Sequence, residues 1–153
     1  LYIIENNNYA MGTSVSRSSS SKDLYKRGVG FDIPGVKIDG MDVLGVIKEA
    51  KKAVDYVRSG KGPMIIEMDT YRYRGHSMSD PAKYRSKEEL QNTKENRDPI
   101  VNLKKHILDN FKDNDNKIKE IELNIKTQVN DIIEFAKKSP QPDISELLTE
   151  IYT

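Results

Sequence analysis

A strand, helix and strand pattern over residues 36–68 constrains the fold of this chain more than any other feature. Val36–Ile38 reads as one short strand, and Met64–Met68, after Gly62-Pro63, reads as the next. Between them, apolar residues recur at the spacing of one helix face: Val43, Val46, Ile47, Ala50, Ala53, Val54 and Val57. Asp42 is placed to cap this helix, and Gly60 to end it. The pattern predicts a βαβ crossover and a parallel sheet.

A further buried strand is expected over Leu1–Ile4, ending at the polar turn Glu5–Asn8. The stretch Ser14–Lys22 holds six serines in nine residues and is interpreted as a surface loop. Lys26–Gly28 is expected to form a turn.

Helical signals dominate the second half of the chain. Ser86 and Glu89 form a capping-box pattern, and Asp98-Pro99 opens another helix. A third helix is expected from about Ile118 to Ala136, before Pro140. We therefore expect an α/β fold with two parts: an α/β part over residues 1–85 and a helical C-terminal region over residues 86–153 that packs on it.

Composition narrows the classes of function. The 153 residues carry 25 Lys and Arg against 24 Asp and Glu, a net charge of +1, which disfavours nucleic acid binding. With no Cys, the chain has no disulfide and no thiolate site. Its apolar runs fall far short of the about 20 residues that span a bilayer, so we expect a soluble chain without membrane contact. Because residue 1 is Leu, the chain is expected to be a piece of a longer protein.

Two segments can carry chemistry. The first, Glu5–Ser14, contains three consecutive Asn residues; it is either an ordinary turn or, at the carboxyl end of a strand, a source of amide and carbonyl ligands for magnesium. The second, Tyr71–Pro81, follows a strand in the same way. Its His76 is either solvated or a proton donor or anion binder. His106 is interpreted as structural, and Ser16–Ser21 as a flexible linker rather than a modification site.

Several segments taken in order resemble one family. They are Glu5-Asn6-Asn7-x-Tyr9-x-Met11-Gly12-Thr13, Tyr25–Gly28, Pro34-Gly35, Asp39–Asp42, Gly60–Pro63 and Thr70–Pro81. This series is similar to the alpha subunits of thiamine-diphosphate-dependent 2-oxo acid dehydrogenases, and to the pyruvate dehydrogenase version in particular. The resemblance is strong over roughly the first hundred residues and looser over the helical tail.

The resemblance implies a three-layer, parallel-sheet fold that holds thiamine diphosphate and magnesium. In this family two alpha and two beta subunits form a heterotetramer, and the acetyl group passes to the lipoyl domain of a dihydrolipoyl acetyltransferase. In register, Asn7 is a magnesium ligand through its side chain, and Tyr9 through its backbone carbonyl; Met11 and Gly12 belong to the same cofactor-binding motif. The other half of the metal motif, Gly-Asp-Gly, is not in this sequence. The 153-residue chain alone is therefore expected to be inactive.

The resemblance also assigns roles in the second segment. His76 matches a histidine close to the cofactor that stabilises the intermediate or assists acetyl transfer, and Arg72 and Tyr73 match residues that order the loop at the mouth of the site. Ser77 matches a serine phosphorylated in mitochondrial relatives, and Ser14 matches a further kinase site. A second phosphorylated serine of those relatives is replaced by Lys83, which favours a bacterial source.

Alternatives remain at this stage. The chain can belong to a branched-chain 2-oxo acid dehydrogenase or an acetoin dehydrogenase, or it can be a noncatalytic helical interaction module. The expected location is the cytoplasm for a bacterial source and the mitochondrial matrix for a eukaryotic one.

Overall fold

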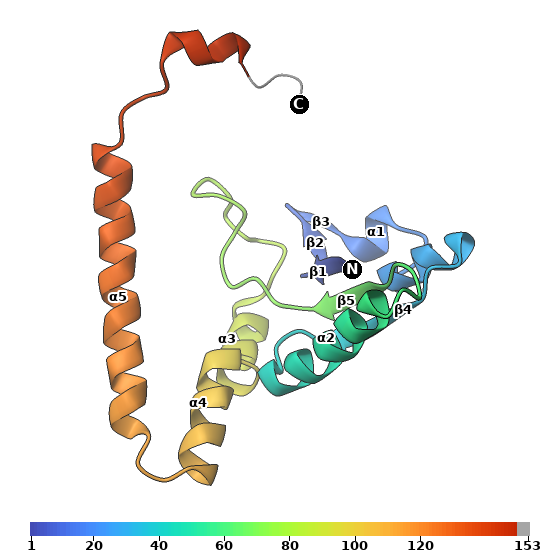
Figure 1. The fold of residues 1–153 in the computed structure, drawn as a ribbon, viewed down its shortest axis with the longest axis horizontal. Helices are drawn as coiled ribbons and strands as arrows, with labels where there is room; N and C mark the ends of the chain where they lie inside the picture. The colour runs from blue at the N-terminus through green and yellow to red at the C-terminus, as the bar shows by residue number, and fades with distance from the viewer. Residues whose placement is uncertain (150–153) are drawn as a thin grey trace. The chain divides into compact units, whose positions relative to one another are not determined.

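The computed structural model describes residues 1–149, and its first part contains a three-stranded parallel sheet (Figure 1). The strands are β1 (Tyr2–Asn6), β4 (Gly35–Asp39) and β5 (Ile65–Asp69), in the order β1-β5-β4. Asn6 lies opposite Asp69, which in turn lies opposite Asp39. All three strands therefore end at one edge of the sheet, and the predicted parallel α/β sheet is confirmed.

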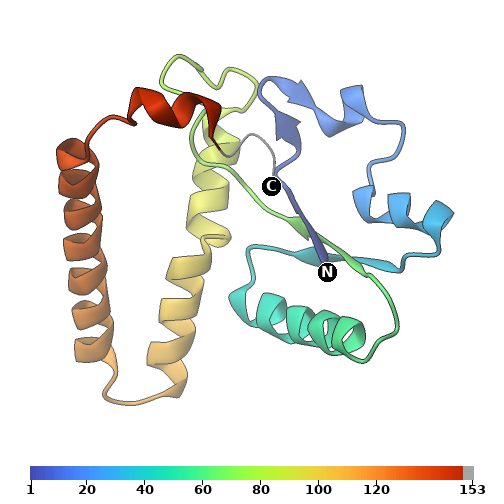
Figure 2. The same ribbon diagram turned by 45° about the horizontal axis from the view of Figure 1, so that its top comes forward.

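The crossover between β4 and β5 is α2 (Val43–Arg58), which runs alongside the sheet in Figure 2. The Asp42 carboxylate accepts a hydrogen bond from the backbone N–H of Leu44 at 3.2 Å, as expected of an N-cap. After the helix, Gly60 has a φ of +76°, a conformation that glycine adopts without steric cost. The helix and both of its predicted ends are confirmed.

The central strand carries most of the buried surface of the sheet. Ile65, Ile66 and Glu67 of β5 are buried, whereas Tyr2 and Ile3 of β1 are 61% and 58% exposed. The buried strand expected over Leu1–Ile4 is thus an edge strand with exposed side chains. Among residues 1–149, β5 is the strand that pairs with it, so its side chains have less cover than those of the central strand.

The segment that follows β1 is more ordered than its composition suggests. It forms a two-stranded antiparallel hairpin, β2 (Tyr9–Ala10) and β3 (Thr13–Ser14), then a short helix α1 (Val15–Ser18). The predictions of a surface loop over Ser14–Lys22 and of a flexible linker over Ser16–Ser21 are therefore wrong up to Ser18, whereas residues 19–22 form neither helix nor strand. Local hydrogen bonds explain the difference: the N–H of Val15 donates to the Asn8 carbonyl at 2.9 Å, and the Ser18 hydroxyl to the Ser14 carbonyl at 3.0 Å.

A 3-10 helix, η1 (Leu24–Phe31), replaces the simple turn expected at Lys26–Gly28. Gly28 is buried at its point of contact with the sheet. A Cβ at this position would lie 2.6 Å from the Ile33 carbonyl oxygen and 2.7 Å from Cδ1 of Ile65. Only glycine allows so close an approach.

The predicted helices of the second half are confirmed. They are α3 (Lys87–Asn96), α4 (Pro99–Asn110) and α5 (Asp115–Lys138), followed by a 3-10 turn η2 (Ile144–Leu148). The Ser86 hydroxyl accepts from the N–H of Glu89 at 3.0 Å, which caps α3. The Asp98 carboxylate accepts from the N–H groups of Ile100 and Val101, each at 3.0 Å, at the start of α4.

The chain divides into two compact units, Leu1–His106 and the part from Ile107 onward. The division of the sequence at residue 85 stays a prediction. In the second unit, α5 presents exposed apolar side chains: Ile121, Leu123, Ile125, Val129, Ile132, Ile133 and Phe135. No helix within residues 1–149 combines the length and apolar character needed to cross a bilayer.

Candidate active site

The turn after β1 presents its polar groups in a fixed arrangement. The Asn6 side-chain oxygen accepts from the N–H of Asn8 at 2.9 Å, and the Asn7 side-chain oxygen accepts from the N–H of Tyr9 at 3.3 Å. Asn8 has a φ of +67°, a left-handed conformation that Asn tolerates better than most residues. These bonds orient the Asn7 amide at the carboxyl edge of the sheet.

The loop after β5 is organised around one carboxylate. Asp80 accepts from the backbone N–H of His76 at 2.7 Å, from the N–H of Ala82 at 2.9 Å and from the Tyr84 hydroxyl at 2.7 Å. These bonds, led by the one from His76, hold the pKa of Asp80 below its ordinary value. A Cβ on Gly75 would lie 2.6 Å from the Asp80 carbonyl oxygen, so the closed loop requires glycine at this position.

Arg85 joins the loop to the turn after β1. Its guanidinium donates to the Arg72 carbonyl at 2.5 Å, to the Asn7 carbonyl at 3.1 Å and to the Asn7 side-chain oxygen at 3.5 Å. It also lies about 5 Å from the ring centroids of Tyr9, Tyr71 and Tyr84, within the range of cation–π attraction. Arg85 thereby holds the two predicted functional segments together.

The two segments form the walls of one pocket of about 360 Å³. Its lining residues are Asn7, Tyr9, Ala10, Met11, Arg72, His76, Tyr84 and Arg85. The structure therefore brings together the candidate metal ligands, Met11 of the same motif, the predicted loop residue Arg72 and the candidate catalytic histidine. They share the edge where parallel strands end, as their positions after β1 and β5 predict.

The other predicted site residues lie beside this pocket or apart from its lining. Gly12 follows Met11 in the hairpin turn, and a Cβ there would be 3.6 Å from the Tyr84 ring. Ser77 is exposed, with its hydroxyl 2.9 Å from that of Ser79. Ser14 pairs with Tyr9 and lines a separate pocket with Lys22 and Lys37.

Tyr73 anchors the loop to the helices. Its hydroxyl donates to the Asp98 carboxylate at 2.9 Å, and Asp98 also caps α4. Burial, with a further effect of this hydrogen bond, raises the pKa of Tyr73 to about 12. The phenol therefore stays protonated and bonded through the physiological range.

Sequence reasoning assigned no role to Arg85, Asp80 or Glu67, although all three organise this region. Asp80 lies in the Thr70–Pro81 motif, and Arg85 follows that motif by four residues. In such a polar segment a charged side chain is usually interpreted as exposed to solvent. Glu67 interrupts an otherwise apolar strand. That interruption is the signal that identifies a buried carboxylate in need of partners.

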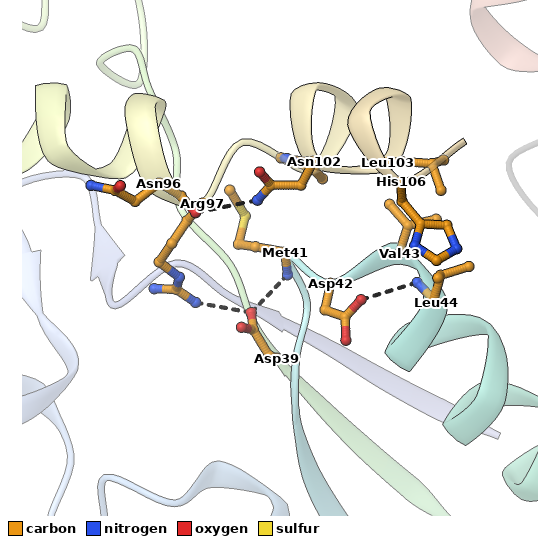
Figure 3. Close-up of a pocket in the computed structure, with 11 residues that line it drawn as sticks. Asp39, Met41, Asp42, Val43, Leu44, Asn96, Arg97, Asn102, Leu103 and His106 are labelled. Atoms are coloured by element: carbon orange, nitrogen blue, oxygen red, sulfur yellow. Dashed lines mark hydrogen bonds and ion pairs between the residues drawn. The ribbon is translucent and has the colours of Figure 1, made fainter. Parts of the chain in front are cut away.

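A second pocket, of about 250 Å³, lies between the start of α2 and the turn from α3 to α4 (Figure 3). Arg97 donates to the Asp39 carboxylate at 2.9 Å and lies 3.9 Å from that of Asp69. It therefore ties the turn after α3 to the ends of β4 and β5. His106, interpreted as structural from the sequence, lines this pocket and not the one that holds His76.

The Asp80→Asn substitution is expected to loosen the loop. One amide oxygen cannot accept from all of the donors that face this carboxylate, so hydrogen exchange at the backbone of residues 75–84 should rise several-fold. Because the folded-state pKa of Asp80 is lowered, its stabilising effect is present at neutral pH. It should be lost as the pH falls below about 4 through the lowered pKa. Exchange measured by mass spectrometry, with Asp131→Asn on α5 as control, checks this; unchanged protection would contradict it.

Comparisons with known proteins show the family to which this chain belongs. The model of the dehydrogenase E1 component family matches residues 1–145. The chain is 52% identical over 151 residues to the pyruvate dehydrogenase E1 component subunit alpha of Rhizobium meliloti, covering 99% of this chain and 43% of that protein. For the subunit of the same name from Rickettsia felis the identity is 54% over 152 residues, covering 99% and 46%.

The mitochondrial subunit of Sminthopsis macroura is 47% identical over 154 residues, covering 100% of this chain and 42% of that protein. The chain thus spans less than half the length of these curated relatives. Its match to the family model nevertheless extends from the sheet through α5. The chain belongs to the dehydrogenase E1 component family.

Proposed function

We propose that this chain is part of the alpha subunit of a pyruvate dehydrogenase E1 component. The proposed reaction is the oxidative decarboxylation of pyruvate with thiamine diphosphate and magnesium, followed by acetyl transfer to a lipoyl group. One observation carries the proposal: Asn7, Tyr9 and His76, which the family motifs select from distant parts of the sequence, line a single pocket. The names of the relatives support the choice of pyruvate.

The residues of the turn after β1 fit a magnesium ion by their donor chemistry. The Asn7 side-chain oxygen and the Tyr9 carbonyl are hard, neutral oxygen ligands of the kind that magnesium takes. Within residues 1–149, no group of three or more His, Cys, Asp or Glu side chains is placed to hold a metal. The remaining ligands must then come from the diphosphate, from water and from residues outside this part of the chain.

The pocket also offers a side chain that suits the proton transfers of the proposed reaction. Thiamine diphosphate, when bound, supplies the nucleophilic carbon and the electron sink for decarboxylation. His76 lines the pocket and offers an imidazole of the kind that serves as a general acid or base. Arg72 donates to the His76 carbonyl at 3.2 Å and so restricts the backbone that carries this imidazole.

The proposed partners follow from the same assignment. They are a pyruvate dehydrogenase beta subunit, in an α2β2 heterotetramer, and the lipoyl domain of a dihydrolipoyl acetyltransferase. We propose the cytoplasm as the location in a bacterial source and the mitochondrial matrix in a eukaryotic one. For a eukaryotic source alone, Ser77 and Ser14 are proposed as phosphorylation positions.

The direct test uses a full-length alpha subunit that contains this segment, assembled with its beta subunit. With thiamine diphosphate, magnesium and a lipoyl acceptor, pyruvate should be turned over with a kcat/KM well above those for branched-chain 2-oxo acids and acetoin. A preference for either of the other substrates would assign the chain to a sibling enzyme. Lack of turnover of all of these substrates would contradict the proposal.

The purified 153-residue chain is expected to show no decarboxylation of pyruvate, even with thiamine diphosphate and magnesium. Its pocket offers the metal two neutral oxygen ligands and no carboxylate from the Gly-Asp-Gly half of the motif, which is not in this sequence. Carbon dioxide release from labelled pyruvate measures this. Turnover above that of the His76→Ala chain would show that the segment is a complete site.

A further inference from the structure

Glu67 is a fully buried carboxylate at the centre of the sheet. An unpaired buried charge is strongly destabilising, so a buried carboxylate needs donors around it. Glu67 has three: the Asn6 side-chain amide at 2.7 Å, the backbone N–H of Tyr25 at 2.9 Å, and the Lys37 ammonium at 3.6 Å. These donors come from β1, η1 and β4 respectively.

The hydrogen bond from Asn6 to Glu67 also fixes the orientation of the Asn6 side-chain amide. Asn6 is itself buried, and its Nδ2 donates to Oε1 of Glu67. Its side-chain oxygen must then point the other way, where it accepts from the N–H of Asn8. The backbone carbonyl of Asn6 accepts from the N–H of Thr70 at 2.9 Å, which fastens the same residue to the end of β5.

We infer that Glu67 is a positioning residue for the metal-binding turn. Glu67 orients the Asn6 amide, and the Asn6 amide holds the left-handed turn at Asn8. That turn places Asn7 and Tyr9, which would supply a side-chain oxygen and a backbone carbonyl to the metal, in the wall of the pocket. This inference rests on the proposed function, because it treats Asn7 and Tyr9 as magnesium ligands.

The contacts from Glu67 through the Asn6 amide to the turn at Asn8 form a relay. Reversing the hydrogen bond between Asn6 and Glu67 tests it. Asn6→Asp places an acceptor against the acceptor of Glu67, and should weaken magnesium-dependent thiamine diphosphate binding by about tenfold or more. Combined with Glu67→Gln, the new amide can donate to the new carboxylate and accept from Tyr25, while the second oxygen of the new carboxylate accepts from Asn8. The double variant should recover binding to within about threefold of the original.

Binding is measured by calorimetry on the full-length alpha subunit assembled with beta, by titrating magnesium at fixed thiamine diphosphate. Thermal unfolding is recorded for every variant. Asn6→Leu, which has neither donor nor acceptor, should weaken binding and should not be rescued by Glu67→Gln. Lys37→Gln removes the ion pair but leaves the relay, and should bind magnesium within about threefold of the original.

The outcomes separate the inference from the proposed function. If Asn7→Ala weakens binding and a folded Asn6→Asp variant does not, only the positioning role fails. If Asn7→Ala binds normally, the metal assignment itself fails. Where Asn6→Asp does not fold, the double variant decides: near-original affinity supports the relay, and a folded double variant that binds more than tenfold more weakly contradicts it. A Lys37→Gln variant as impaired as Asn6→Asp would also overturn the relay.

Discussion

Ser77→Glu in the assembled enzyme is expected to lower acetyl transfer by about tenfold or more, because it adds a negative charge where the loop must close. Ser77 directly follows His76, whose backbone N–H is held by the Asp80 carboxylate at 2.7 Å. A new carboxylate would add charge close to Asp80, whose backbone N–H donates to the Ser77 carbonyl at 3.2 Å, in the loop that borders the proposed diphosphate site. Arg72 already donates to the His76 carbonyl, so its capture by the new charge would also disturb the loop.

The matched variant is Ser77→Ala, which should keep much of the activity. The Ser77 hydroxyl lies 2.9 Å from that of Ser79, and the proposed reaction assigns it no chemistry. Steady-state transfer to a lipoyl domain measures both variants, with Ser18→Glu on α1 as a control for charge alone. If Ser77→Ala were as inactive as His76→Ala, the serine would have a direct catalytic role.

Asn7→Ala is expected to raise the magnesium and thiamine diphosphate concentrations needed for half-maximal binding by about 100-fold or more. Loss of a residue that merely supports a metal ligand typically costs about 10- to 100-fold, and loss of the ligand itself should cost at least as much. The side-chain oxygen of Asn7 is already oriented by the N–H of Tyr9. Unchanged affinity for both would contradict its assignment as a ligand.

Tyr9→Phe provides the control for Asn7→Ala. Only the backbone carbonyl of Tyr9 is assigned to the metal, and this substitution keeps it. The variant loses one hydrogen bond, from the Tyr9 hydroxyl to the Tyr84 carbonyl at 3.2 Å, but retains the ring contact with Tyr84 at 4.8 Å. Magnesium-dependent binding should therefore stay within about fivefold of the original.

The sequence predicts the regular elements of this fold because their signals are local. The apolar spacing from Val43 to Val57, the cap at Asp42 and the N-cap at Ser86 each depend on a few neighbouring residues, and each is confirmed. The exposed outer side of β1 depends instead on which strands flank it. That is a property of the tertiary structure, which the apolar residues of Leu1–Ile4 do not determine by themselves.

The serine-rich segment shows a different limit. Its composition suggests a loop, yet Val15 is fastened to Asn8 by a backbone hydrogen bond, and α1 follows directly. The meeting of the two chemical segments could be predicted from the rule that parallel strands end at one edge. Two sets of long-range contacts organise these segments: Arg85 lies near three tyrosine rings, and Glu67 accepts a hydrogen bond from Asn6. The partners in these contacts are far apart in the sequence, so no local pattern identifies them.

The most direct measurement is the anomalous scattering of Mn²⁺, used in place of magnesium, in crystals of the full-length assembly with thiamine diphosphate. We predict a metal peak within about 2.2 Å of both the Asn7 side-chain oxygen and the Tyr9 carbonyl oxygen, with the Arg85 guanidinium moved away from the Asn7 side chain. A bound metal that lies elsewhere, with Arg85 still hydrogen-bonded to that oxygen, would contradict the proposed site.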